Sequence, residues 1–301
     1  MLASIHRSAP KNRQGLPFGF SPTYNRSVIL RRLCFPLCLP ALILLLGTDA
    51  VAQQVQLRHW SGQGVAPVYE GFDVNPDGSF NMWFGYMNRN YEETLDIPIG
   101  PDNRFEPGGD RGQPTHFEIR RHKDVFKVVV PKDFGDQRLV WFLTEHGKTE
   151  EVSGSLKPVW MIDRNRTTRG GNSEQINSNT PPVVRVETPE ATLNAPGTLN
   201  LSISVTDDGL PARGGKPVGM TASWAKYRGA GAVRIAPAQS KVMDGHASVA
   251  ATFDTPGEYV LQVVVDDGSG ELAGNFGYHC CWTNAQVKIT VQGGAHENAQ
   301  R

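Results

Sequence analysis

The chain of 301 residues lacks the motifs by which common enzyme classes are recognised. It has no G-x-S-x-G nucleophile elbow, no H-E-x-x-H zinc motif, no glycine-rich phosphate loop and no C-x-x-C pair. The histidines after residue 52 are scattered, and we interpret them as surface residues: His59, His116, His122, His146, His246, His279 and His296. These absences count against catalysis, and the sequence predicts no catalytic residue and no cofactor.

Helical periodicity is also missing. Apolar residues do not recur at helical spacing over several turns, whereas 32 glycines and 21 prolines divide the chain into short segments. This composition is typical of short strands joined by turns. We therefore predict an all-β fold, with two immunoglobulin-like antiparallel β-sandwich domains after a signal peptide.

Residues 1–52 have the organisation of a secretory signal peptide with an extended amino-terminal region. Arginines precede an apolar run of 14 residues, 33–46, which is shorter than the roughly 20 residues of a membrane-spanning helix. Small residues at Ala50 and Ala52 suit signal peptidase, so we expect cleavage after Ala52 and a periplasmic or secreted protein. An uncleaved anchor is the alternative.

Basic residues are not in excess. Without residues 1–52, which carry six Lys or Arg and one Asp, the chain has 24 basic and 29 acidic residues and a net charge of −5. A mildly acidic chain lacks the basic surface that nucleic-acid binding requires. We expect a protein or polysaccharide partner at the cell envelope, and no membrane span after signal cleavage.

A polar segment divides the remaining chain. Residues 163–182 contain almost no apolar side chains, and such a segment cannot bury enough surface to offset the entropy of ordering it. We predict a flexible linker there, between a front β-sandwich at 53–162 and a rear β-sandwich at 183–293. A disordered tail is expected at 294–301.

The rear segment alternates apolar and polar residues, which places the apolar side chains of each strand on one face. Strands are predicted at 183–187, 199–205, 219–227, 247–253, 259–265 and 287–291, with a seventh at 232–236.

A family resemblance is carried by the stretch ATFDTPGEYVLQVVVDDGSG. It resembles the penultimate-strand region of PKD-like, immunoglobulin-fold repeats of exported bacterial proteins. Asp254, Gly257 and Tyr259 match a tyrosine corner, in which the tyrosine hydroxyl bonds to upstream backbone. Trp224 lies where such sandwiches often bury a tryptophan. The resemblance covers 181–293 and implies the fold, but no particular function, because this fold serves many roles.

Two loops of the rear segment should emerge at one end of the sandwich, because strands B and F of this fold run in the same direction. One loop begins with Asp207 and Asp208, and the other with Asp266 and Asp267. Paired loops on a rigid sandwich are common binding sites. The predicted ligand-binding residues are Asp207, Asp208, Asp266, Asp267, Tyr278, His279 and Trp282. Four carboxylates could hold Ca²⁺, but Asp-Gly turns need no ion, so calcium is the less favoured interpretation.

Cys280 and Cys281 are neighbours, and the two other cysteines lie in the expected signal peptide. In an oxidising compartment the pair can close a ring, bind a metal together with His279, or remain free or intermolecular. Three consecutive residues converge poorly on one tetrahedral ion. We therefore predict a vicinal disulfide, acting as a structural clasp, a contact plate beside Tyr278 and Trp282, or a redox switch.

The front segment also has β character. Asn75-Pro76-Asp77-Gly78 predicts a hairpin turn, followed by an apolar face at Phe80, Met82, Phe84 and Tyr86. Further strands are predicted at 124–130 and 138–156, with a turn at His146-Gly147. An immunoglobulin-like sandwich is favoured over a jelly roll or barrel. The loop 100–114 is long for such a fold, and we interpret it as a surface excursion or a recognition loop.

These features predict an exported, non-catalytic binding or adhesion-type protein that contacts a cell-surface component, polysaccharide or protein. Trp83 or Trp141 could stack on sugar rings if either faced outward, although burial is expected. One alternative is an exported hydrolase whose site is assembled in the front domain from converging His, Asp or Glu. Another is a structural spacer of an envelope assembly.

Overall fold

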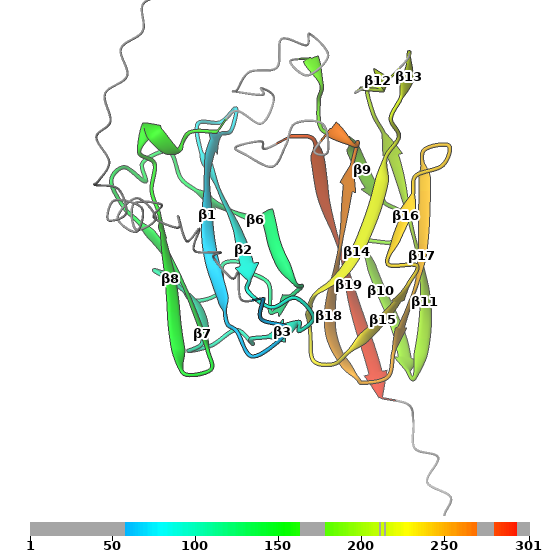
Figure 1. The fold of residues 1–301 in the computed structure, drawn as a ribbon, viewed down its shortest axis with the longest axis horizontal. Coiled ribbons are helices and arrows are strands. Elements are labelled where there is room, and N and C mark those ends of the chain that lie inside the picture. The colour runs from blue at the N-terminus through cyan, green and yellow to red at the C-terminus, as the bar shows by residue number, and fades with distance from the viewer. Residues whose placement is uncertain (1–57, 163–177, 211, 214, 270–279, 294–301) are drawn as a thin grey trace, which may run out of the picture. The chain divides into compact units, whose positions relative to one another are not determined.

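The computed structural model describes residues 58–162, 178–210, 212–213, 215–269 and 280–293 (Figure 1). The expected signal peptide, residues 163–177 of the predicted linker and the predicted tail lie outside these ranges. The described elements are β-strands and one short 3-10 helix, η1 (Pro158–Trp160), so the fold is all-β. Within the described ranges, no helix has the length and apolar character needed to cross a membrane. Residues 56–301 cluster as one compact unit.

The front sandwich, described residues 58–162, contains two three-stranded sheets. The first has the order β1-β2-β6, and its strands are β1 (Val65–Val74), β2 (Phe80–Asn88) and β6 (Arg120–Val130). The second has the order β4-β7-β8, and its strands are β4 (Asn103–Glu106), β7 (Leu139–Glu145) and β8 (Lys148–Gly154). A short pair joins β3 (Leu95–Asp96) to β5 (His116–Phe117).

Aromatic side chains from both front sheets form the core. Phe84 of β2 contacts Phe105 of β4 edge to face, at 5.1 Å between ring centroids, and Trp141 stacks on Phe105 at 5.7 Å. The predicted apolar face of β2 is confirmed, because Met82, Phe84 and Tyr86 are buried. Trp141 is buried as well. Trp83 is half-buried on the opposite face of β2, where its Nε1 donates to Asp73.

The segment 100–114 differs from the predicted loop. It contains β4, and Asn103 and Gln113 are fully buried in it. The amide of Asn103 donates to two backbone carbonyls, and its Oδ1 accepts a hydrogen bond of 3.0 Å from Nε1 of Trp141. A buried amide with all these partners ties the chain to the core. The interpretation as a surface excursion therefore fails for Asn103, Phe105 and Gln113, which are buried, whereas residues 106–112 are exposed.

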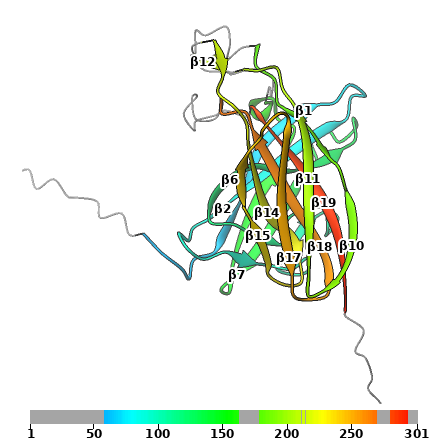
Figure 2. The same cartoon turned by 90° about the vertical axis from the view of Figure 1, so that its right-hand side faces the viewer.

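The rear sandwich, described residues 178–293, contains a five-stranded and a four-stranded sheet, whose strands lie side by side in Figure 2. The larger sheet has the order β10 (Glu190–Ala195), β19 (Trp282–Gly293), β18 (Gly257–Asp266), β14 (Thr221–Gly229), β16 (Gln239–Lys241). The smaller has the order β15 (Val233–Ala236), β17 (His246–Phe253), β11 (Gly197–Thr206), β9 (Val183–Val186). A further pair joins β12 (Ala212–Arg213) and β13 (Lys216–Pro217).

The rear sandwich is not wholly antiparallel. Strand β10 runs parallel to β19, while the preceding strand β9 pairs antiparallel with β11 in the other sheet. The first strand of the sandwich is thus divided between the two sheets. The expectation of an antiparallel fold is wrong at this edge, and β10 was missed although Ala191, Leu193 and Ala195 alternate with polar residues.

Apolar side chains from both rear sheets meet in one core, with Leu201 and Ile203 on one side and Leu261 and Val263 on the other. Tyr259 is buried, and its hydroxyl donates to the backbone oxygen of Thr255 over 2.7 Å. The hydrogen bond expected of a tyrosine corner is therefore present.

A bulge in β6 joins the two sandwiches. The pairing of β6 with β2 shifts register, and Asp124 in the shifted stretch has a positive φ of 46°. The Nδ2 of Asn284 donates to the carbonyls of Asp124 (2.7 Å) and Val125 (3.1 Å), and the Nε2 of Gln262 donates to Val125 (3.0 Å). Carbonyls released from strand pairing by the bulge are satisfied by side chains of the rear sheet.

Candidate functional site

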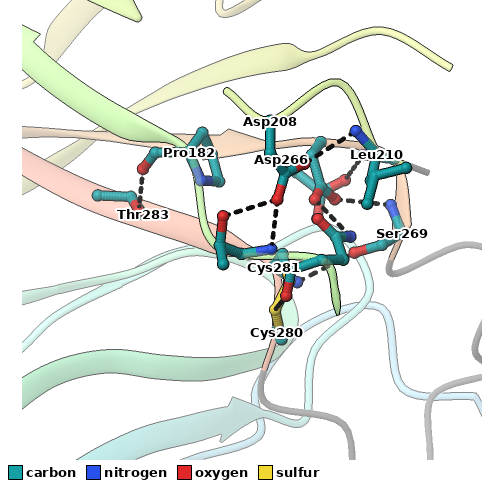
Figure 3. Close-up of a disulfide and its surroundings, with 12 residues drawn as sticks. Pro182, Asp208, Leu210, Asp266, Ser269, Cys280, Cys281 and Thr283 are labelled. Atoms are coloured by element: carbon teal, nitrogen blue, oxygen red, sulfur yellow. Dashed lines mark hydrogen bonds between the residues drawn. A yellow bond between two sulfur atoms is a disulfide. The ribbon is translucent and has the colours of Figure 1, made fainter. Parts of the chain in front are cut away.

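The two predicted aspartate pairs lie at one pole of the rear sandwich, where β11 and β18 end. The carboxylates of Asp207 and Asp267, one from each loop, are close enough to repel each other electrostatically. Asp208 is exposed and accepts hydrogen bonds from the backbone nitrogen of Thr180 (2.8 Å) and from its hydroxyl (2.7 Å). Figure 3 shows Asp208 and Asp266 near the start of β19. The structure thus brings together Asp207, Asp208, Asp266, Asp267 and Trp282, whereas Tyr278 and His279 lie outside the described residues.

Burial controls the charges of this pole. Desolvation raises the pKa of Asp207, and the neighbouring carboxylates of Asp208 and Asp267 raise it further. Desolvation likewise raises the pKa of Asp267, which is buried, although hydrogen bonds from Ser269 and Asn179 oppose the shift. For Asp208, desolvation is outweighed by hydrogen bonds from Thr180 and Leu210, which lower the pKa. The pole therefore combines an exposed, readily ionised carboxylate with two weaker, more buried acids.

All four carboxylates cap the turns in which they lie, and Asp267 does so by accepting from the backbone nitrogen of Ser269. Asp207 accepts from the backbone nitrogen of Gly209, Asp208 from that of Leu210 and Asp266 from that of Gly268. This is the geometry of Asx turns. Among the described residues, no group of three or more His, Cys, Asp or Glu side chains is arranged to hold a metal ion. The calcium site considered from the sequence stays without support from this geometry.

The cysteine pair forms the buried base of the pole. The structure joins the sulfur atoms of Cys280 and Cys281 (Figure 3), and both residues are buried. Their sulfurs lie 3.9 and 3.7 Å from the carbonyl oxygen of Asn179. The backbone nitrogen of Cys281 donates to the hydroxyl of Ser269 over 3.0 Å, and Trp282 packs against the pair. The pair therefore contacts segments on both sides of the pole.

A charged cluster that the sequence did not reveal connects the sandwiches. His116 on β5 bonds to Asp96 through Nδ1 (2.8 Å) and lies 3.4 Å from Glu118 through Nε2. Lys226 of β14 lies 2.9 Å from Asp96. The signal available was the spacing of two residues between His116 at the start of β5 and Glu118 just after it. Their approach to Lys226, which is distant in the chain, is a property of the tertiary structure.

Burial by itself would lower the pKa of His116, but hydrogen bonds to Asp96 and Glu118 outweigh it and raise the pKa. The rival hydrolase hypothesis expected converging His, Asp and Glu in the front sandwich, and this cluster has that composition. However, both ring nitrogens of His116 face carboxylates. This arrangement favours the protonated imidazole within an ion-pair array, whereas a general base needs a free ring nitrogen.

No protein-family model matches the chain, and no curated protein matches it. Several solved structures are similar. Domains 4 and 5 of the surface-layer protein SbsC share 10% identity over 76% of this chain and 98% of that chain, with a TM-score of 0.24. A conjugative transposon lipoprotein from Bacteroides eggerthii shares 13% identity over 36% of this chain and 96% of its own, with a TM-score of 0.25. Titin domains I67–I69 share 8% identity over 77% and 67%, with a TM-score of 0.22.

Proposed function

We propose that this is an exported, non-catalytic binding protein of the cell envelope, and that the pole of the rear sandwich is a contact surface. The observation that carries the proposal is the convergence of two loop starts, at Asp207-Asp208 and Asp266-Asp267, on one buried base at Cys280-Cys281. A rigid base beneath charged loops holds a recognition surface in one shape, which reduces the entropy lost on binding. Export is supported by the signal-like residues 1–52.

Export and processing are tested by expressing the full chain in a bacterial host and separating periplasm, medium and cytoplasm. The proposal expects the protein outside the cytoplasm with Gln53 as its first residue. Recovery of an unprocessed chain in the cytoplasm would contradict it.

Binding is tested by sedimentation with purified envelope fragments. Asp208→Asn removes the exposed carboxylate of the pole, while Asp254→Asn removes a comparable exposed carboxylate at the start of the turn before β18, at the other end of that strand. We expect the wild type and Asp254→Asn to sediment with the fragments. The amount of Asp208→Asn that sediments should be at least about threefold lower, because the variant loses one charge-assisted contact of under about 1 kcal/mol.

Pretreatment of the fragments with protease or with periodate distinguishes a protein partner from a polysaccharide partner. If no envelope component retains the wild type, or if the two variants behave alike, the pole is not the contact surface.

A further inference from the structure

A cavity of about 620 Å³ lies between the sandwiches, within the part of the chain that forms one compact unit. Its walls are the β5–β6 region of the front sandwich and strands β14, β18 and β19 of the rear. The volume falls in the range of small-molecule sites, roughly 300–1,000 Å³. It is lined by, among others, Glu118, His122, Ala225, Lys226, Trp282 and Asn284.

The charges around this cavity are already paired. Three ion pairs lie at the wall: His116–Glu118 at 3.4 Å, Arg121–Glu70 at 2.6 Å and Lys226–Asp96 at 2.9 Å. The two further charged residues of the wall, Lys123 and Asp266, are also engaged in contacts. A charged ligand would therefore have to compete with an existing partner for each of these groups. The wall therefore favours an uncharged ligand.

Hydrogen-bond acceptors are left over in the wall. The Oδ1 of Asn284 is buried and has no partner, while its Nδ2 is held by the carbonyls of Asp124 and Val125. His122 lies 3.0 Å from the carbonyl of Ile119 through Nε2, so that nitrogen carries the proton. Burial lowers the pKa of His122, and in the neutral ring Nδ1 is an acceptor. The unpaired Oδ1 of Asn284 therefore suits a ligand that brings a hydrogen-bond donor, because a buried unpaired acceptor is costly.

Aromatic rings provide the apolar part of the wall. Trp282 is half-buried and lines the cavity, and Tyr86 stacks on His122 at 5.0 Å between ring centroids. A pyranose ring is neutral, carries several hydroxyl donors and presents apolar C–H faces that pack on aromatic rings. We propose that this cavity binds a neutral saccharide unit of an envelope polysaccharide. The inference rests on the proposed function and names the chemical class of its partner.

The test titrates the full-length processed protein with chitotriose, maltotriose and cellotriose, followed by tryptophan fluorescence and calorimetry. Ala225→Phe fills the cavity from β14 without removing a hydrogen bond of a side chain. The matched control is Ala250→Phe on β17, which does not line the cavity and lies on the face of its strand opposite the core. We expect at least one saccharide to bind the wild type, Ala225→Phe to weaken it at least about tenfold, and Ala250→Phe to change it less than about twofold.

A second variant, at His122, tests the same cavity if Ala225→Phe fails to fold. His122→Phe retains the ring beside Tyr86 but removes the Nδ1 acceptor, and should weaken binding several-fold. Absence of saccharide binding, equal binding by wild type and both variants, or binding of spermidine in place of sugars would overturn the proposal. Envelope sedimentation that depends on Asp208 but survives periodate and Ala225→Phe would overturn the saccharide site while leaving the proposed function intact.

Discussion

Buried polar side chains fasten segments of this chain to one another through single hydrogen bonds. Asn103 connects β4 to Trp141, Tyr259 ties β18 to the turn before it, and Asn179 contacts both Asp267 and the cysteine pair. Each is buried, so each would leave an unsatisfied partner if it were removed. At the residue scale, these few polar contacts inside otherwise apolar cores specify which segments of the chain pack together.

Tyr259→Phe tests the tyrosine corner. The variant keeps the ring against Phe253, at 5.1 Å between centroids, and removes the hydroxyl that bonds to Thr255. We expect urea unfolding to show a loss of about 1 kcal/mol in the free energy of unfolding. Tyr259→Leu, which also removes the ring, should cost more. Equal stability of Tyr259→Phe and wild type would show that the hydroxyl does not stabilise the fold.

The redox state of Cys280 and Cys281 is measured by the intact mass of the exported protein with and without reductant. We expect the unreduced chain to be lighter by two hydrogens. The double variant Cys280→Ala/Cys281→Ala should lose only about 1 kcal/mol of stability, because closing the shortest loop removes little chain entropy. A disulfide-linked dimer, or a reduced chain that carries a metal, would contradict the vicinal pair.

At the scale of elements, bulges in two strands position the groups by which the two sandwiches contact each other. The β6 bulge turns the carbonyls of Asp124 and Val125 toward the rear sheet. Strand β14 has a second register shift near Lys226, and beyond it Tyr227 is buried in the front core. Bulges re-aim side chains and carbonyls at such edges. Two bulged strands, β6 and β14, therefore contribute to the contact between the sandwiches, together with side chains of β18 and β19.

Glycine is required at position 229, opposite Tyr259 in the β14–β18 pairing. A Cβ at Gly229 would overlap the Tyr259 ring, and the residue has a φ of 155°. We expect Gly229→Ala to lower the free energy of unfolding by roughly 1–3 kcal/mol, as overpacked core sites do.

Gly219→Ala is the matched control for this substitution. Gly219 has a φ of 98°, but the space that a Cβ would enter there is open. This variant therefore measures backbone strain without overlap, at about 1 kcal/mol. Urea denaturation of both variants separates the two effects. A smaller loss for Gly229→Ala than for Gly219→Ala would contradict the steric argument.

Over the whole molecule, the sandwiches are joined by a contact that includes both amide–carbonyl hydrogen bonds and charges. Lys226 of the rear sandwich completes the cluster of Asp96, His116 and Glu118. Since the pKa of His116 is raised and the pKa of His122 is lowered, protonation links pH to the stability of the region around the cavity. The two histidines act in opposite directions.

Stability should pass through a maximum near pH 6.5, about the ordinary pKa of histidine. The raised pKa of His116 adds stability below this pH that is lost as the pH rises through the folded-state pKa. The lowered pKa of His122 adds stability above this pH that is lost as the pH falls through its folded-state pKa. Because Asp96 is half exposed, the effect of His116 should be on the order of 1 kcal/mol or less.

Urea unfolding of His116→Gln and His122→Gln between about pH 5 and 8 checks this pH dependence. His116→Gln should abolish the decline above the maximum, and His122→Gln the decline below it. Asp96 and Glu118 face His116, and Glu118 and Arg121 face His122, so these carboxylates must stay ionised across the range. A flat profile for the wild type would contradict the assignment.

Local patterns in the chain were enough to predict the all-β class, the rear strands with period-two alternation, the hairpin turns at 75–78 and 146–147 and the meeting of the two aspartate loops. Alternation selects the buried face of a strand, and turn residues select the backbone conformation. Folding in three dimensions was needed to bury Asn103, Phe105 and Gln113 of the segment 100–114, to set β10 parallel to β19 and to form a charged cluster and a cavity between the sandwiches. Those features depend on partners far apart in the chain, such as Asp124 with Asn284, whose approach no local pattern encodes.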